Sequence, residues 1–261
     1  MFLDGSILAD YFVWGLVFLI FASFVAGFID SVAGGAGLIL VPSFILAGLP
    51  AQIALGQEKL VSTIGTLSAI FNFFKSKKIV WNFVIIGVPV ALLGAFVGAK
   101  MILFLDENFV GKIIAFLMPF GLLFSFFPKK DEQNSAQITL KQKIIFPFLT
   151  FIIGFYDGFF GPGTGSLLIL ALYYVMNLSL VASSATSKIF NLASNIGAFI
   201  AFTLAGKMLF LIGIPMIIAS ILGNFIGSKM AIKSGDKFIR PILFGMIFVL
   251  FLSLIYKYFF A

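Results

Sequence analysis

Two lysines and two aspartates lie inside apolar stretches of this sequence, at positions that match between the two halves of the chain. Lys59 corresponds to Lys188, and Asp30 corresponds to Asp157. Charged side chains within apolar segments are rare and usually functional. An ammonium group in such a place can bind an anion, extend to a membrane interface from a helix end, or pair with a carboxylate. The carboxyl groups could carry coupling protons, or they could accept backbone hydrogen bonds and brace the chain.

A cluster of glycines follows each aspartate and is a second candidate feature. Glycine lets the backbone turn and lets a ligand approach closely, and a helix that begins after such a turn has N–H groups without a helical partner. Helix starts of this kind bind anions, although the same glycines could simply allow close helix packing. The candidate anion-binding residues are Gly34, Gly35 and Gly37 in the first cluster and Gly161, Gly163, Thr164 and Gly165 in the second.

Polar side chains accompany the second lysine. Asn191 and Asn195 follow Lys188 at helical spacing and would add hydrogen-bond donors and acceptors on adjacent faces of a helix. They could bind a substrate or bridge membrane helices. The chain has no His and no Cys, which excludes Ser-His relays, thiol nucleophiles and metal centres ligated by those residues. We therefore expect no catalytic residue, no cofactor and no metal.

The two aspartates also allow an interpretation from a different class, an intramembrane aspartyl protease with Asp30 and Asp157 as its dyad. Two carboxyl groups that share a proton would supply the chemistry. However, glycine precedes each aspartate by three residues, unlike the G-x-G-D pattern expected of such proteases. We favour a bracing role for both aspartates, because a negative charge in the permeation path would oppose an anion.

The composition places the chain in a membrane. Hydrophobic residues make up 61% of the 261 residues and charged residues 10%, and the mean hydropathy is +1.17. A soluble domain has about 25% charged residues. Apolar runs of about 18 residues or more, the length that a helix needs to cross a bilayer, recur along the chain. We expect an all-α protein that crosses the membrane several times and has no separate soluble domain.

The net charge of +7 is carried by loops, which argues against a nucleic-acid partner. By the positive-inside rule, the basic loops are cytoplasmic, and the acidic residues Asp10 and Asp106 mark the opposite side. The sequence therefore predicts a multi-pass protein of the inner membrane, surrounded by lipid, with its N-terminus outside. The basic clusters are Lys75, Lys77 and Lys78; Lys129, Lys130, Lys141 and Lys143; and Lys229, Lys233, Lys237 and Arg240.

The apolar runs divide into five segments in each half of the chain. Leu38–Leu46 and Leu167–Val175 are too short to cross and should be broken or re-entrant helices. An odd number of crossings per half would insert the halves in opposite orientations. We assign residues 1–128 and 144–261 to two inverted transmembrane repeats and 129–143 to a cytoplasmic basic linker. The other predicted segments are Tyr11–Ile29, Leu60–Phe74, Val80–Ala99, Phe109–Phe127, Ile144–Phe160, Ile189–Leu204, Met208–Ile226 and Pro241–Phe260.

The internal repeat is also visible in the letters of the sequence. Gly27–Leu38 reads GFIDSVAGGAGL, and Gly154–Ser166 reads GFYDGFFGPGTGS. Glycine-interrupted segments at corresponding positions of two halves indicate a transporter binding site near the bilayer midplane, between the repeats. Lys59 and Lys188 both stand near the start of a predicted long apolar helix, where they could reach that site.

These two motifs resemble the signature motifs of the TauE/SafE family of sulfite and organosulfonate exporters, including its YfcA-like members. Ser187–Gly197 and Lys237–Pro241 are similar to that family as well. The resemblance implies an inner-membrane transporter of small sulfur-containing or organic anions. Independently of the resemblance, we keep a homodimer open as the assembly. Glu58 departs from the pattern, because a small or neutral polar residue is expected before Lys59.

Overall fold

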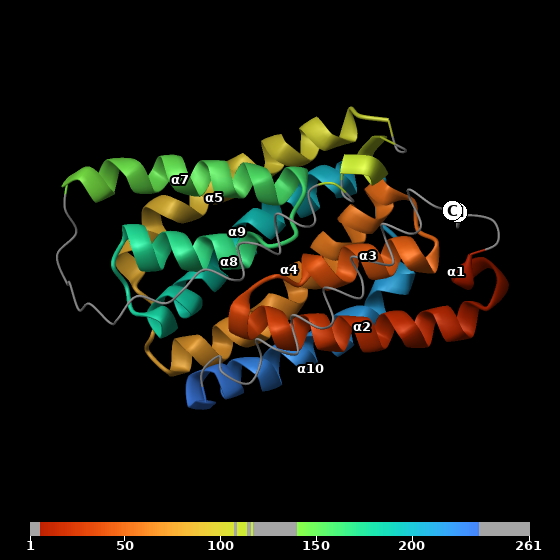
Figure 1. Ribbon diagram of the computed structural model, residues 1–261, viewed down its shortest axis with the longest axis horizontal. Coiled ribbons are helices and arrows are strands. Elements are labelled where there is room, and N and C mark those ends of the chain that lie inside the picture. Colours follow the sequence, from red (N-terminus) through yellow and green to blue (C-terminus); the bar gives the residue numbers. More distant parts are fainter. Residues whose placement is uncertain (1–5, 107–108, 114–115, 117–139, 235–261) are drawn as a thin grey trace.

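The computed structural model describes residues 6–106, 109–113, 116 and 140–234, and the structural statements below refer to these residues. They form helices and turns, without a β-strand in the described part (Figure 1). The elements are α1 (Ile7–Asp10), α2 (Phe12–Ala33), α3 (Gly37–Ala47), α4 (Ala51–Lys75), α5 (Trp81–Leu103), α7 (Leu140–Phe159), α8 (Thr164–Leu170), the π-helical turn η2 (Ala171–Val175), α9 (Leu180–Leu204) and α10 (Phe210–Ser234).

Each predicted short segment is a short helix in the structure. The first is α3 with 11 residues, and the second is α8 with 7 residues, which continues into the 5 residues of η2. At about 1.5 Å per residue, such helices cover about half of a roughly 30 Å hydrocarbon core. The first short helix ends at Gly48, whose φ of +105° suits glycine, and Pro50 then precedes α4.

The predicted starts of α4 and α9 were wrong. The structure begins α4 at Ala51 rather than Leu60, and it begins α9 at Leu180 rather than Ile189. Polar residues interrupt the apolar run in the early turns of both helices, but their side chains face the protein interior rather than ending the helix. Consequently Lys59 and Lys188 lie well inside their helices, and not near the helix starts where the sequence had predicted them.

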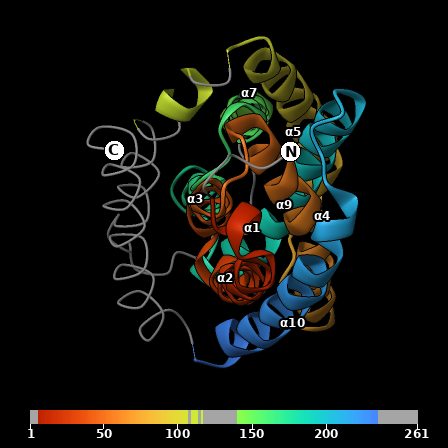
Figure 2. The ribbon, with the colours of Figure 1, turned by 90° about the vertical axis from the view of Figure 1, so that its right-hand side faces the viewer.

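The helices of the two halves interleave. The central helices α4 and α9 contact each other, and α4 also packs against α2, α3 and α10, whereas α9 packs against α5, α7 and α8. The first half's α5 lies along α7 of the second half, and the second half's α10 lies along α2 of the first half. Figure 2 looks along the bundle, with α2, α3 and α7 nearly end-on.

Hydrogen bonds between helix ends indicate where the chain turns back. Gln52 Nε2 at the start of α4 donates to the Leu105 carbonyl just after α5, at 2.9 Å. Gln142 Nε2 at the start of α7 donates to the Val175 carbonyl at the end of η2, also at 2.9 Å. The second short helix therefore returns to the end of the molecule where α7 began. Gly48 at the end of α3 lies against Ser6, just before α1, so the first short helix likewise returns to the start of its half.

The outer helices carry apolar side chains on their exposed faces, as a protein in lipid requires. Three helical stretches, Phe12–Ala33, Trp81–Leu103 and Phe210–Lys233, are long and apolar enough to cross a membrane among the described residues. Ile85 on α5 and Leu211 on α10 are 79% and 85% exposed. The central helices α4 and α9 are more polar than the outer helices, and most of their polar side chains are buried in the protein.

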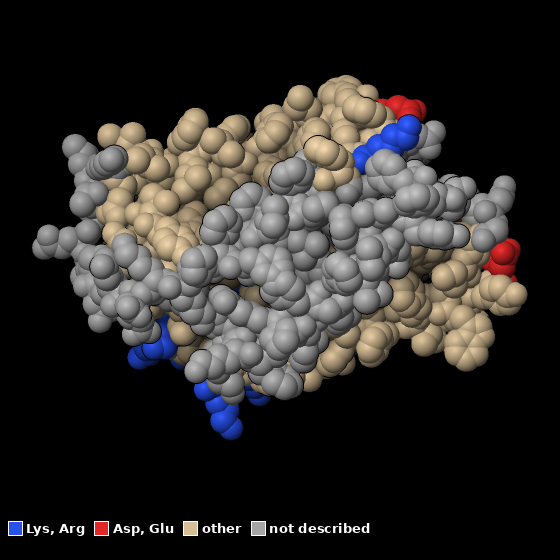
Figure 3. Space-filling view, in the orientation of Figure 1, with Lys and Arg blue, Asp and Glu red and all other residues tan. Residues whose placement is uncertain are grey.

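Exposed charges gather at opposite ends of the molecule. Figure 3 shows acidic side chains at the end that carries α1 and most of the visible basic side chains at the other end. The exposed residue Lys75 ends α4, the exposed residues Lys77 and Lys78 follow it, and the exposed residues Lys229 and Lys233 lie near the end of α10. Most of the predicted segment Phe109–Phe127, and the whole of the segment Pro241–Phe260, lie outside the described residues.

Candidate functional site

The two glycine turns predicted from the sequence meet at the centre of the molecule. The φ angles of Gly34 and Gly161 are +75° and +92°, a region that glycine adopts without strain. A Cβ atom on Gly34 would clash with the backbone of Gly165, and one on Gly37 would lie 3.1 Å from the Cα atom of Pro162. The lack of side chains on these residues lets the turns of the two halves touch.

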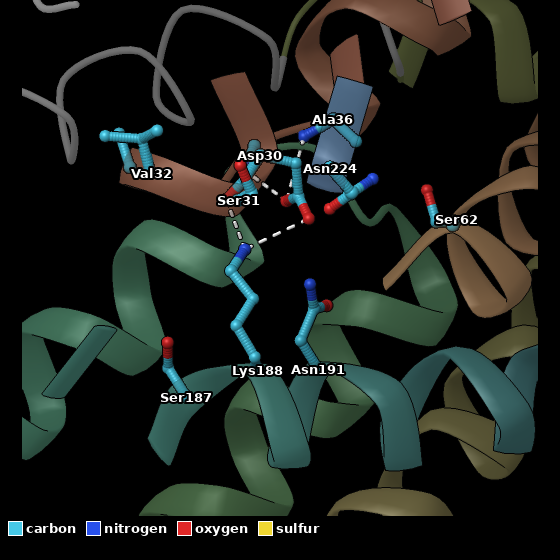
Figure 4. A network of polar contacts seen from close by, with 12 residues as sticks. Asp30, Ser31, Val32, Ala36, Ser62, Ser187, Lys188, Asn191 and Asn224 are labelled. Atoms are coloured by element: carbon cyan, nitrogen blue, oxygen red, sulfur yellow. Dashed lines mark hydrogen bonds and ion pairs between the residues drawn. The ribbon is translucent and has the colours of Figure 1, made fainter. Parts of the chain in front are cut away.

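Lys188 of α9 reaches from the second half to Asp30 of α2 in the first half (Figure 4). Its Nζ lies 3.0 Å from Asp30 Oδ2 and also donates to the Asp30 backbone carbonyl. The other oxygen, Asp30 Oδ1, accepts N–H hydrogen bonds from Gly35 at 3.1 Å and Ala36 at 3.3 Å in the first glycine turn. This buried pair balances one ammonium with one carboxylate, and both carboxylate oxygens have partners.

Lys59 of α4 makes the reciprocal contact with Asp157 of α7 in the second half. Its Nζ lies 2.9 Å from Asp157 Oδ1 and 3.2 Å from Asn195 Oδ1. It also lies 2.9 Å from Oε2 of Glu58, whose Oε1 accepts a 2.7 Å hydrogen bond from Ser62 Oγ. The other oxygen of the aspartate, Asp157 Oδ2, has no hydrogen-bond partner within the described part of the chain. This cluster therefore contains two carboxyl groups for one ammonium.

The charged side chains are enclosed by protein. Lys59 and Lys188 are 1% and 0% exposed, so neither ammonium group extends toward the surface. Each aspartate is bonded to a lysine and not to the other aspartate, which does not support a protease dyad. Of the alternatives raised by the sequence for the two lysines, these contacts correspond to pairing with a carboxylate.

The asparagines of α9 lie beside both lysines. Asn195 Nδ2 donates to Asn191 Oδ1 at 3.3 Å, so the two amides form a short chain along the helix. Figure 4 shows the Asn191 side chain pointing toward the space that Asp30 and Lys188 also face, with Asn224 of α10 nearby. Polar atoms from α2, α4, α9 and α10 thus converge on one buried region.

The remaining predicted residues shape the turns. Gly35 and Gly163 have φ angles of +114° and +88°. The Thr164 hydroxyl donates to the Gly161 carbonyl at 2.6 Å and is therefore engaged within its own turn. The structure thus brings every predicted site residue into the central region, with these three contributing conformation rather than contacts between the two clusters.

Sequence reasoning missed a polar stripe on α10. Ser220, Asn224 and Ser228 are buried there, and Asn72 Nδ2 of α4 donates to Ser228 Oγ at 2.8 Å. The sequence contains a sign of this stripe, because the segment GNFIGSK at 223–229 aligns with GAFVGAK at 94–100 in the other half. In that match, buried alanines of α5 occupy the positions of the polar residues of α10. Only the second half's α10 carries the stripe.

Comparison with known proteins identifies the family. The sequence model of the family described as "Sulfite exporter TauE/SafE" matches residues 19–254. The chain belongs to this family. A Haemophilus influenzae protein named "Probable membrane transporter protein" is 37% identical to it over 249 residues, which cover 92% of this chain and 94% of the relative. The TauE/SafE family is a transporter family and not an enzyme family, so the chain is a multi-pass membrane protein of transporter type.

Two further relatives carry similar names. "Probable membrane transporter protein YfcA" of Escherichia coli K12 is 32% identical, with 91% of this chain and 88% of the relative covered. "Probable membrane transporter protein ORF9" of a Sinorhizobium species is 35% identical, with 87% of each covered. No solved structure matches the chain.

Proposed function

We propose that this protein is a secondary transporter of small anions of the sulfite or sulfonate type, in the inner membrane, with the anion bound between the two halves. The observation that carries the proposal is the reciprocal pairing of Lys59 with Asp157 and of Lys188 with Asp30, at the place where two glycine turns meet. The family description, which names a sulfite exporter, supports the choice of substrate class.

The arrangement of the helices supports an inverted repeat. α5 contacts α7 and α9, and in the same way α10 contacts α2 and α4. Counting α2 and α7 as first elements and the short helices as second, the fourth element of each half contacts the first and third elements of the other half. Two such halves related by an axis in the membrane plane are a common transporter architecture, with the substrate at their junction.

Charge distribution supports the proposed orientation. Most of the basic side chains visible in Figure 3 lie at one end of the molecule, and the acidic side chains lie at the opposite end. The positive-inside rule places the lysine end in the cytoplasm and the described start of the chain outside.

The buried lysines suggest how an anion is held. Each ammonium bonds to a carboxylate of the other half, so motion of one half relative to the other loosens a Lys–Asp pair without breaking the backbone. In the proposed cycle, the lysine on the open side exchanges its aspartate for the substrate anion. When the halves move apart, the turns that touch at Gly34 and Gly165 separate and let the anion approach the backbone, and the amides of α9 orient it.

The test is flux into liposomes that contain the purified protein. Sulfite and isethionate, a fully ionised sulfonate, should enter faster than into protein-free liposomes, and Lys188→Met should slow both while its melting temperature shows that it is folded. Ligand-induced thermal stabilisation by the same anions gives an independent measure of binding. Failure of both anions to move or to stabilise the protein would contradict the proposed substrate class.

A further inference from the structure

The two Lys–Asp clusters are equivalent in sequence but differ in charge. Asp30 and Lys188 form a balanced pair, whereas Lys59 lies between two buried carboxyl groups, those of Asp157 and Glu58. The residue before Lys188 is Ser187, an uncharged side chain at the position that Glu58 occupies before Lys59. The excess acid therefore belongs to one half of the protein.

The carboxylates of Asp30 and Asp157 also differ in their hydrogen-bond partners. Gly35, five residues after Asp30, donates its N–H to the Asp30 carboxylate. Pro162 stands five residues after Asp157 and has no N–H to donate. In the described structure, Asp157 Oδ2 accordingly has no hydrogen-bond partner, although Asp157 is only 1% exposed. Both carboxylate oxygens of Asp30 therefore have partners, whereas only Oδ1 of Asp157 has one among the described residues.

A protein interior strongly disfavours a second unbalanced carboxylate. With both carboxyl groups ionised, the cluster around Lys59 would carry one net negative charge while its three side chains are at most 4% exposed. A buried charge without a partner is expensive, and an acid in this situation becomes neutral by taking up a proton. One proton converts a carboxylate to a carboxylic acid and brings the cluster from a charge of −1 to 0.

We propose that Glu58 and Asp157, around Lys59, form a binding site for one proton, and that this proton is the coupling ion of the transporter. This proposal rests on the proposed anion transport. A cluster with a charge of −1 repels an anion from the neighbouring region, and the proton that makes the cluster neutral removes this repulsion. Proton binding therefore strengthens anion binding, and anion binding strengthens proton binding, because coupling between two binding sites is reciprocal. In the proposed cycle, the proton and the anion are carried together and move in the same direction.

The charges on the neighbouring elements leave this balance unchanged. On α7, the Tyr156 hydroxyl donates to the Pro162 carbonyl at 2.8 Å. On α9, Lys188 is neutralised by Asp30 of α2. No ionisable side chain occurs on α3. The face of α10 toward α4 presents Ser220 and Asn224, while Lys229 and Lys233 are exposed near its end. No further cation therefore offsets the second carboxylate among the described residues.

Infrared difference spectroscopy of the purified protein during a pH titration tests the proton site without any substrate. The wild type should show the C=O band of a buried protonated carboxyl group. Glu58→Gln and Asp157→Asn should each lose that band, because either change leaves one carboxylate for one ammonium. Glu58→Ser, which copies the residue before Lys188, serves if Glu58→Gln folds poorly. Asp30→Asn is the matched control and should keep the band.

Binding of isethionate at several pH values tests the coupling. Isethionate carries no titratable proton in this range, so a change in its affinity reports on the protein. Wild-type affinity should rise as the pH falls, by as much as about tenfold per pH unit for one coupled proton. The affinity should become independent of pH in Glu58→Gln and Asp157→Asn.

The outcomes separate the two proposals. A carboxyl band that persists in Glu58→Gln, Glu58→Ser and Asp157→Asn, or its absence from the wild type throughout the pH range in which the protein stays folded, would overturn the proton site. Isethionate affinity that is flat with pH in the wild type would overturn the coupling. If isethionate and sulfite do not bind at any pH, the proposed substrate class fails, and the infrared titration still decides whether the proton site exists.

Discussion

Lys59 Nζ and Asp157 Oδ1 lie 2.9 Å apart although 98 residues separate them in the chain. The contact joins a helix of the first half to a helix of the second, and Lys188 joins the halves in the opposite sense. Removing one partner of a buried pair typically costs about 3–5 kcal/mol, because the other charge is left without compensation. The two halves therefore depend on each other for the neutralisation of their own interior charges.

The contact between the glycine turns gives the first prediction. Gly34→Ala should destabilise the protein more than Gly206→Ala, because a Cβ on Gly34 would clash with the backbone of Gly165. Gly206 has a similar positive φ of +67° but nothing within 4 Å of an added Cβ. Gly206→Ala should therefore be destabilised only by the strain of an alanine at positive φ, about 1–2 kcal/mol. Melting temperatures in detergent compare the variants, and equal losses would mean that the turns do not touch.

The absence of native cysteine makes the second prediction direct, because single cysteines can be introduced into the natural chain. Lys77→Cys and Lys233→Cys should react with a membrane-impermeant maleimide only when the cytoplasmic side is accessible. Asp106→Cys and Gly206→Cys should react in intact cells. All four positions lie outside the proposed site. Labelling of Lys77→Cys and Lys233→Cys from opposite sides would exclude the inverted arrangement.

The sequence predicted the helical class, the two short helices and the residues of the central turns. These features are local: apolar runs give helices, short runs give short helices, and glycine clusters give turns. The starts of α4 and α9 were misplaced for the same reason. Gln57, Glu58 and Lys59 look like the polar end of an apolar run when the partners that bury them are unknown.

The partners of the lysines could not be read from the sequence. Spacing identifies Lys59 and Lys188 as equivalent, but equivalence does not say whether each faces its own aspartate or that of the other half. Glu58 was noticed only as a departure from the family pattern. Its importance emerges from the position of its Oε2 beside Lys59 and Asp157, which is a property of the folded chain.

The polar stripe of α10 gives the third prediction. Asn224→Ala copies Ala95, the residue at the matching position of α5. The change removes hydrogen bonds to Ser220 but also removes Asn224 Oδ1, a buried acceptor without a partner among the described residues, so stability should change by less than about 1 kcal/mol. Anion flux into liposomes should fall, because Asn224 lies beside the central region (Figure 4).

The reverse substitution is the control for that prediction. Ala95 is fully buried, and its backbone contacts the position of Gly158 closely enough that a Cβ there would clash. Ala95→Asn should therefore overpack this interface and lower the melting temperature by the equivalent of about 1–3 kcal/mol. Flux that is unchanged in a folded Asn224→Ala variant would remove α10 from the transport path.

The fourth prediction concerns the two lysines. Lys59→Met should be more destabilising than Lys188→Met, although both remove one buried ammonium. After Lys188→Met, the Asp30 carboxylate keeps two N–H hydrogen bonds from the first glycine turn. After Lys59→Met, Asp157 loses the hydrogen bond of its Oδ1 while its Oδ2 already lacks one. Chemical unfolding in detergent at neutral pH should rank the variants in this order, with a loss of about 3–5 kcal/mol for the worse case.

A double-mutant cycle then isolates the pair that joins the halves. Asp30→Asn keeps an oxygen that can accept from Gly35 and Ala36, so Lys188→Met combined with Asp30→Asn leaves no buried charge at that position. The double variant should regain most of the stability that Lys188→Met loses, because the uncompensated carboxylate is gone, yet it should not recover anion flux. Losses that simply add would mean that the two charges do not interact in the folded protein. Full recovery of flux in the double variant would show that Lys188 only balances Asp30, and the lysine would then have no part in binding the anion.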